Sequence, residues 1–241
     1  MRAFFTTLLV LVTVGCGDSE TSVEAKAWGS IDALGRSGET SLAASYSSKL
    51  DNESCQAIDG RSACVLVECE PDAMRAFVNA GEVSVGDDVL ERGDDGSYSL
   101  VVPEALVPGE SLAMRASGSS RVPKHSGSVV VPEALELSSA FEDPLVVDAS
   151  VDLVVTWTPL ESDRVALSMT FDELEIRCTA TAAAGELTIA SRLLGALPDD
   201  VTGSFSLVNE NVTDSSVEGW RIWLGAHQVV AEGSVELAPS E

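Results

Sequence analysis

Cysteines are the residues of this sequence whose chemistry follows most directly from their spacing. The chain has five. One ends an apolar leader, and the other four are Cys55, Cys64, Cys69 and Cys178. An even number in an exported chain favours two disulfide bonds, with all three connectivities open. No pair has CxxC spacing and the chain has only two histidines, so we expect no structural zinc site.

The segment CQAIDGRSAC, residues 55–64, predicts a β-hairpin. Its Asp59-Gly60 dipeptide favours a two-residue turn, because glycine adopts positive φ without steric cost. A turn centred there places Cys55 opposite Cys64 at a non-hydrogen-bonded pair, where Cα atoms approach to roughly 4.5–5.5 Å. We therefore expect a Cys55–Cys64 disulfide; the alternative is a loose loop with other pairing. Cys69 and Cys178 lie on apolar strand faces and either pair together or stay as buried thiols.

Histidines and carboxylates offer no recognisable catalytic pattern. His125 lies in the polar loop RVPKHSGS, and His227 lies between two apolar strand segments. A Ser–His–Asp arrangement is defined by geometry, and no nucleophile, phosphate-loop or metalloprotease motif is present. The sequence therefore predicts no catalytic residue, no cofactor and no enzyme. The alternative is a hydrolase that uses loop carboxylates.

Paired aspartates at expected loop tips raise the question of Ca²⁺, which takes six to eight oxygen ligands. The pairs are Asp87-Asp88, Asp94-Asp95 and Asp199-Asp200. No EF-hand or repeat spacing accompanies them. We expect solvated turns and no metal site, with a Ca²⁺-dependent ligand-binding module as the alternative.

Two tryptophans near the C-terminus are expected on opposite faces of one strand. Trp220 and Trp223 are three residues apart, and strand side chains alternate. Trp220 belongs with the apolar Ile222, whereas Trp223 shares the outer face with Arg221. Because an exposed Trp offers a large rigid surface, Trp223 and Arg221 form a candidate ligand contact. The alternative is that another part of the chain covers Trp223.

The first sixteen residues, MRAFFTTLLVLVTVGC, have the form of an export signal. The apolar run Ala3 to Val14 is shorter than the roughly 18–20 residues that span a bilayer. A Cys after a small residue at the end of such a run resembles the lipobox of bacterial lipoproteins. Thr13 departs from that pattern, in which Leu is usual. The resemblance implies cleavage before Cys16 and acylation of Cys16; the alternative is an ordinary signal with an incidental Cys.

Acylation would anchor the chain in a membrane. Each buried methylene contributes about 0.8 kcal/mol, so the several acyl chains of this family hold firmly. Residue two of the mature chain would be Gly17 rather than the Asp that retains such lipoproteins in the inner membrane. The resemblance therefore favours the outer membrane of the cell envelope and leaves the face open.

The charge balance excludes several partners. The formal net charge is −25, with 39 acidic and 14 basic side chains. Such an excess argues against nucleic acid and anionic lipid headgroups as ligands. Nothing after Val14 is long and apolar enough to cross a membrane. Expected partners are the membrane, through the lipid anchor, and an unidentified protein or glycan.

The elements that position these residues are predicted to be short strands. Residues 16–50 are rich in Ser, Gly, Thr and Ala and are expected to form a lipidated, flexible tether. In residues 80–116 the order G-x-V-x-V, D-G-x-Y, L-x-P-G-x-x-L resembles prealbumin-like modules. That family consists of small Ig-like β-sandwiches that serve as spacers or binding modules.

The last hundred residues alternate apolar and polar side chains, as in Val165, Leu167, Met169 and Phe171. Seven such segments with turns between them are typical of an antiparallel sandwich, and only Ser191 to Leu197 looks briefly helical. We predict an all-β chain with two tandem antiparallel β-sandwiches of Ig-like or prealbumin-like type. Their bounds are a signal peptide at 1–15, a tether at 16–50, a first sandwich at 51–142 and a second at 143–241.

The whole chain also resembles a set of uncharacterised lipoproteins from large-genome Gram-negative bacteria. The shared features are the CGD start, the cysteine triplet, the segment Val122 to Val129 and the strand Asp152 to Trp157. That resemblance implies no activity. The sequence thus favours a non-catalytic envelope lipoprotein that presents β-sandwiches for binding, adhesion or spacing. The alternative is a module that binds carbohydrate or a Ca²⁺-dependent ligand.

Overall fold

The chain folds almost entirely into β-strands, which confirms the predicted all-β class. The computed structural model describes residues 27–36, 38–47, 55–61, 63–69, 77–138, 141–198 and 201–238. Within these ranges the helical segments are a 3₁₀ turn, Ala182–Ala184, and the helix α1 (Ser191–Leu194). That helix lies inside the segment where the sequence predicted one.

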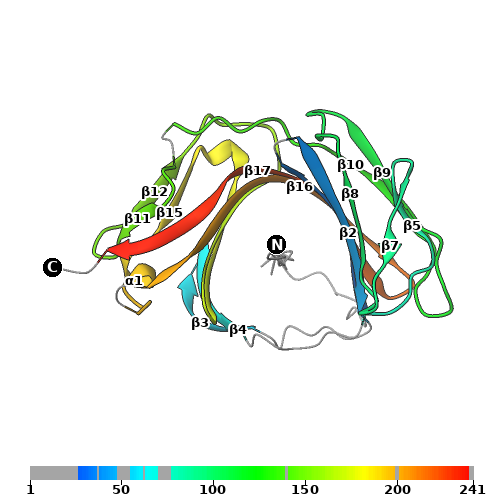
Figure 1. Ribbon diagram of the computed structural model, residues 1–241, viewed down its shortest axis with the longest axis horizontal. Coiled ribbons are helices and arrows are strands. Elements are labelled where there is room, and N and C mark those ends of the chain that lie inside the picture. Colours follow the sequence, from blue (N-terminus) through cyan, green and yellow to red (C-terminus); the bar gives the residue numbers. More distant parts are fainter. Residues whose placement is uncertain are drawn as a thin grey trace, which may run out of the picture.

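One large sheet forms the frame of the molecule. Its eleven strands are β1 (Ala27–Arg36), β2 (Glu39–Ser47), β3 (Cys55–Arg61), β4 (Cys64–Cys69), β7 (Glu91–Arg92), β8 (Tyr98–Val102), β11 (Leu145–Asp148), β13 (Arg164–Phe171), β14 (Leu174–Thr181), β16 (Thr202–Val217) and β17 (Trp220–Ala238). They run in the order β3-β4-β14-β13-β16-β17-β1-β2-β8-β7, and β11 adds to β17. The sheet bends into an arch with β16 and β17 across its top (Figure 1).

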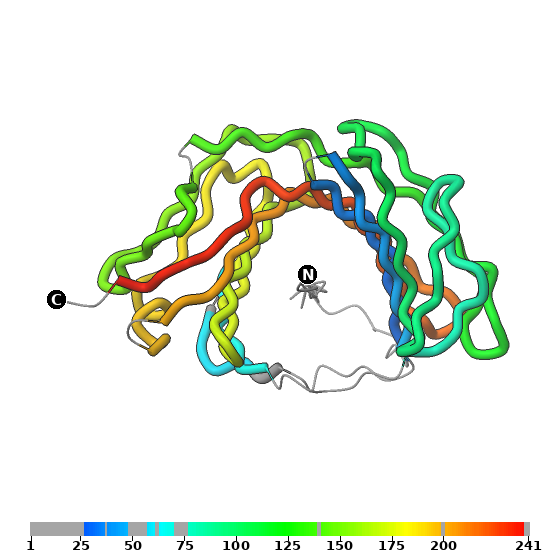
Figure 2. Tube along the Cα trace, in the orientation of Figure 1, coloured from blue at the N-terminus to red at the C-terminus, as the bar shows by residue number. Residues whose placement is uncertain are grey.

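A smaller sheet packs on the outer side of each limb of the arch (Figures 1 and 2). One has the order β10-β9-β5-β6, built from β5 (Val83–Val85), β6 (Asp88–Val89), β9 (Ser111–Ala116) and β10 (His125–Val130). The other pairs β12 (Leu153–Thr156) with β15 (Glu186–Ile189). Each limb is therefore a two-layer sandwich, and we call the β9 limb the first sandwich and the β15 limb the second.

Each sandwich has its own core between its two layers. In the first, Ile31, Tyr46 and Met114 are fully buried. In the second, β13 buries Leu167 and Met169 completely. The alternation read from the sequence over β13 therefore corresponds to one face turned to this core, because strand side chains alternate in direction.

The strand β17 contributes to both cores. Its first half places Trp220 and Ile222 in the first core, and its second half places Val235 and Leu237 in the second. The predicted domain boundary at 142/143 therefore does not separate the two cores. In the same way β4, expected in the first sandwich, pairs with β14 of the second.

The middle of the β16–β17 hairpin is irregular and polar. A β-bulge shifts the register between Leu207 and Val208. The next residue, Asn209, is fully buried; its Nδ2 donates to the Glu133 carbonyl at 2.7 Å, and its Oδ1 accepts from Ser162 Oγ at 2.8 Å. These bonds connect the hairpin to the loops that carry Glu133 and Ser162. They also offset the cost of burying the polar Asn209 side chain.

The prediction that residues 16–50 form a tether is wrong for residues 27–36 and 39–47. They form β1 and β2, and β1 pairs in parallel with β17 through nine residue pairs, from Ala27–Trp220 to Gly35–Gln228. The core side of β1 carries Ile31 together with the small residues Ala27, Gly29 and Ala33, and these small residues hid the alternation. Cys16 and the leader lie outside the described residues.

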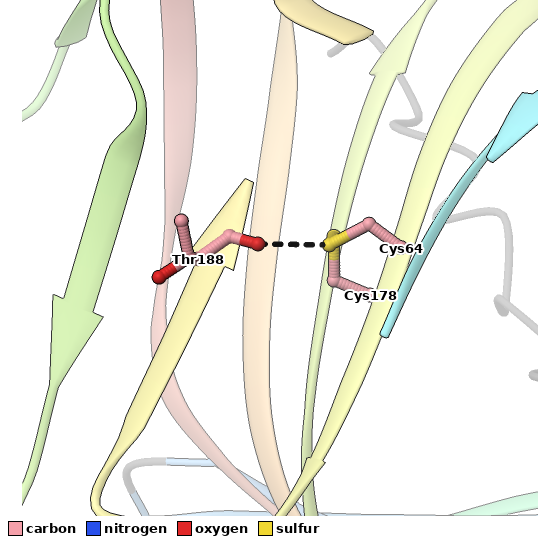
Figure 3. Close-up of a disulfide and its surroundings, with 3 residues drawn as sticks. All are labelled: Cys64, Cys178 and Thr188. Atoms are coloured by element: carbon pink, nitrogen blue, oxygen red, sulfur yellow. Dashed lines mark hydrogen bonds between the residues drawn. A yellow bond between two sulfur atoms is a disulfide. The ribbon is translucent and has the colours of Figure 1, made fainter. Parts of the chain in front are cut away.

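The predicted Cys55–Cys64 disulfide is also wrong. Cys64 is bonded to Cys178, with the two Cα atoms 4.1 Å apart (Figure 3). These residues lie directly opposite each other on β4 and β14. The neighbouring Thr179 donates to the Ala63 carbonyl, so Cys64 and Cys178 form a non-hydrogen-bonded pair, in which side chains are close enough to bridge.

The position of the turn explains the error. Arg61 pairs with Cys64, so the strands turn after Arg61 rather than at Asp59-Gly60. A bulge at Ile58, between Ala57 and Asp59, then shifts the register by one residue. Asp59 instead forms an ion pair with Arg192 in α1, at 2.7 Å. One extra residue in a strand moves every later partner, so Cys55 lies opposite Cys69, which is itself disulfide-bonded.

Candidate binding site on the concave face

The large sheet has a second face, opposite the two cores, on the inner side of the arch (Figure 2). We call it the concave face. Since Trp220, Ile222 and Leu224 of β17 point into the first core, the alternating Arg221 and Trp223 lie on the concave face. The predicted opposite orientation of Trp220 and Trp223 is therefore confirmed, with Trp220 buried and Trp223 half-buried.

Trp223 is flanked by a second tryptophan and by an arginine. The ring of Trp28 in β1 lies 6.3 Å from it, centroid to centroid, at 56°. The guanidinium carbon of Arg221 lies 5.2 Å from the ring centroid, a distance that allows cation–π attraction. Arg221 also donates to Asp214 of β16 at 3.1 and 3.2 Å. The alternative, that another part of the chain covers Trp223, therefore holds only in part, because Trp28 of β1 lies beside a ring that stays half-exposed.

A hollow of about 260 Å³ opens beside these side chains. It is lined by Asp163, Arg164, Val212, Asp214, Arg221 and Trp223. It lies where β13 begins, because pairing of β13 with β16 stops at Arg164–Glu210 while β16 continues to Val217. Beyond that point β16 is an edge strand on this side among the described strands.

At the start of this free edge of β16, the side chain of Asp163 occupies the place of a paired strand. The amide of Val212 donates to the Asp163 carboxylate at 2.8 Å, and the Asp163 amide donates to Asn211 Oδ1 at 2.8 Å. Backbone groups of a strand alternate in direction, so those of Asp214 and Ser216 also point toward the hollow. The hollow therefore offers donors and acceptors of both side chain and backbone beside an aromatic ring.

A charged cluster lies next to the hollow at the top of the arch. His227 Nδ1 lies 2.8 Å from Glu210 Oε2, and His227 Nε2 lies 3.1 Å from Asp32 Oδ1. The second oxygen of Glu210 accepts from Arg164 Nε. Glu210 is fully buried, whereas Arg164 reaches the wall of the hollow. Gly225, opposite Asp32, leaves the space for the contact, since a Cβ there would collide with His227 Nε2 and Asp32 Oδ1.

The two carboxylates hold His227 in its protonated form. Burial by itself favours the neutral ring, but hydrogen bonds and charge from Asp32 and Glu210 outweigh it and raise the pKa of His227 to about 9. Burial likewise opposes ionisation of Glu210, and His227 with Arg164 outweighs it and lowers the pKa of that carboxyl. Both ring nitrogens donate, so His227 has no free nitrogen to act as a base near pH 7.

The other histidine is inside the first core. His125 Nε2 lies 3.0 Å from the Tyr46 hydroxyl, and Nδ1 lies 3.0 Å from the Pro123 carbonyl. Because Pro123 accepts, Nδ1 carries the proton and Nε2 accepts from Tyr46. Burial lowers the pKa of His125, so the ring is neutral, and burial raises that of Tyr46. The contacts of His125 are those of a core residue, although the sequence placed it in a polar loop.

Trp223 and Arg221, the predicted ligand contacts, therefore lie together in the lining of one hollow. The sequence did not reveal the residues around them. Parity along β17 would have placed His227 on the same face, four residues beyond Trp223. Asp32 and Trp28 could not be found from the sequence, because they lie in the segment predicted to be a tether. Arg164 and Glu210 meet only through the β13–β16 register.

The remaining predicted sites fall elsewhere. Asp95 accepts from the amide and hydroxyl of Ser97, so it closes its own turn. Asp199 and Asp200 lie outside the described residues. In the part of the chain that the structure describes, no three His, Cys, Asp or Glu side chains come together as metal ligands, and no helix is long and apolar enough to span a bilayer.

The chain was compared with family models, curated proteins and solved structures. No protein-family model matches it, and no curated protein matches it. Among solved structures it is similar to a crystal structure of titin domains, with 14% identity over 83% of this chain and 60% of that chain and a TM-score of 0.21. Extracellular domains 3–5 of Drosophila OTK give 9% identity, 84% and 71% coverage and a TM-score of 0.19. Overlaps this low carry no conclusion about function.

Proposed function

We propose that the protein is a non-catalytic lipoprotein of the cell envelope that presents two fused β-sandwiches for binding, with the concave face as its binding surface. The leader with Cys16 supports the anchor, and the absence of an Asp at position 17 supports the outer membrane. The observation that carries the binding role is the hollow beside Trp223 and Arg221. It combines an aromatic ring with charged donors and acceptors, a composition enriched in binding surfaces.

The histidines support a non-catalytic role. His227 is protonated and held by two carboxylates, and His125 is neutral and held by a phenol and a carbonyl. Each is occupied by contacts within the fold. General-base catalysis by a histidine needs a ring nitrogen free to take a proton from a substrate near neutral pH, which neither ring offers.

Anchoring and display are tested together in a Gram-negative host. Cells that express the full chain are fed radiolabelled palmitate, fractionated, and treated with protease before and after outer-membrane permeabilisation. The expected result is a labelled protein in the outer-membrane fraction that loses its label in the Cys16→Ser variant. An unlabelled wild type, or equal labelling of the variant, would overturn the anchor, and recovery of the wild type in the cytosol would overturn display.

A further inference from the structure

We propose that the hollow beside Trp223 binds an uncharged saccharide. This inference deepens the proposed function, because it names the ligand class of the concave face. The hollow contains Arg164, Arg221, Asp163 and Asp214, whose charges cancel. A site with no net charge in a strongly acidic protein favours a neutral ligand over an anion or a cation.

The chemistry of the lining fits a polyhydroxylated ring. The guanidinium of Arg221 supplies donors in a fixed plane, and the carboxylates of Asp163 and Asp214 supply acceptors beside it. Vicinal hydroxyls donate and accept at once, so they match such pairs. The half-buried ring of Trp223 supplies a rigid apolar surface for the C–H face of a sugar, and Trp28 supports it from β1.

The guanidinium over Trp223 is able to move aside at little cost. The Arg221 and Asp214 side chains are 51% and 55% exposed, and exposed ion pairs contribute roughly 0–1 kcal/mol. A sugar that displaced Arg221 from the ring would leave it free to stay near Asp214. In contrast, Arg164 is fixed by the buried Glu210, so that wall of the hollow is preorganised.

An extended peptide fits this edge less well than a sugar. A strand added to β16 needs a row of free backbone groups. The amide of Val212 is already taken by Asp163, so only Asp214 and Ser216 offer both an amide and a carbonyl on that side before β16 ends at Val217. Two residues do not supply the ladder that strand addition requires.

The test is calorimetric titration of the full chain, purified in detergent, with neutral oligosaccharides: hexamers of β-1,4-linked glucose, of α-1,4-linked glucose and of N-acetylglucosamine. Binding of at least one is expected. Trp223→Ala and Arg221→Ala should each weaken it about tenfold, the effect of losing an aromatic or charge-assisted contact. Circular dichroism confirms that both variants are folded.

Arg192→Ala is the matched control, because Arg192 forms a similar exposed ion pair with Asp59 on the second sandwich. It should bind as the wild type does. The proposal is overturned if no oligosaccharide binds, if Arg192→Ala weakens binding as much as Trp223→Ala, or if a sulfated polysaccharide or an extended peptide competes for the hollow more strongly than any neutral sugar. None of these outcomes touches the lipid anchor, which the palmitate experiment tests separately.

Discussion

The two histidines of the chain lie in two regions that treat the same side chain in opposite ways. His227, at the top of the concave face, lies between two carboxylates and carries a positive charge. His125, inside the first core, lies between a phenol and a carbonyl and is neutral. Burial opposes the charge in both places, so the difference comes from the partners alone. The comparison shows that the partners of a buried histidine decide whether its ring is charged.

Removing the Glu210 carboxylate should lower the free energy of unfolding more than any other substitution considered for the two histidine regions. Glu210→Ala leaves His227 and Arg164 without the carboxylate between them, and loss of one member of a buried ion pair costs roughly 3–5 kcal/mol. Urea unfolding measures the change. Asp214→Ala, which breaks the exposed pair with Arg221, is the matched control and should cost about 1 kcal/mol or less. Equal losses in the two variants would contradict a special role for the buried cluster.

Removing the Tyr46 hydroxyl, which hydrogen-bonds His125, should lower the free energy of unfolding by less than the loss of Glu210 does. Tyr46→Phe leaves His125 Nε2 buried without its donor, and an unsatisfied buried polar group costs about 1–3 kcal/mol. The same urea titration compares this variant with Glu210→Ala. A larger loss in Tyr46→Phe than in Glu210→Ala would reverse the ranking of the two regions.

A substitution at Gly225 distinguishes the contribution of Asp32 to the charge of His227 from that of Glu210. Gly225→Ala places a methyl group where His227 Nε2 meets Asp32, so that contact must open while the Glu210 contact stays. Overpacking of this kind costs about 1–3 kcal/mol, and the pKa of His227 should fall. NMR titration of the ring protons measures it. An unchanged pKa in the variant would show that Asp32 contributes nothing to holding the proton.

The dependence of stability on pH should have opposite signs for the two rings. His227 has a folded pKa raised to about 9, so its contribution is complete below its unfolded pKa of about 6.5 and is lost as pH rises toward 9. His125 has a lowered folded pKa, so its contribution is present above pH 6.5 and is lost as pH falls. Unfolding of His227→Gln and His125→Gln against the wild type, at pH 5, 7 and 9, measures both slopes. Slopes of the same sign would contradict the assigned protonation states.

Sequence alone was sufficient where one strand face is strongly apolar. In β13 the apolar residues Val165 to Phe171 recur with period two, and the same rule placed Trp220 inward and Trp223 outward. It failed for β1, whose core face includes Ala and Gly and whose other face includes Trp28 and Leu34, and for β2, whose other face is rich in Ser. Small side chains weaken the contrast on which the period depends.

Partners across the sheet were out of reach of the sequence. The disulfide prediction depended on a turn at Asp59-Gly60, but the strands turn after Arg61, so Cys64 lies opposite Arg61 on β3 and is bonded to Cys178 on β14. His227 and Asp32 are 195 residues apart and meet only because β1 pairs in parallel with β17. One sequence contains the pattern along each strand but not the order in which strands lie side by side.

Strand β17, which follows all the other described strands in sequence, completes the first sandwich. Trp220, Ile222 and Leu224 fill a core whose other members come from β1 onward, so no shortened chain ending at residue 142 can close it. A chain exported as proposed above would have to cross the inner membrane as far as β17 before either half acquires its native interior. Until β17 emerges, both incomplete interiors would be exposed, as in the folding intermediates that chaperones bind.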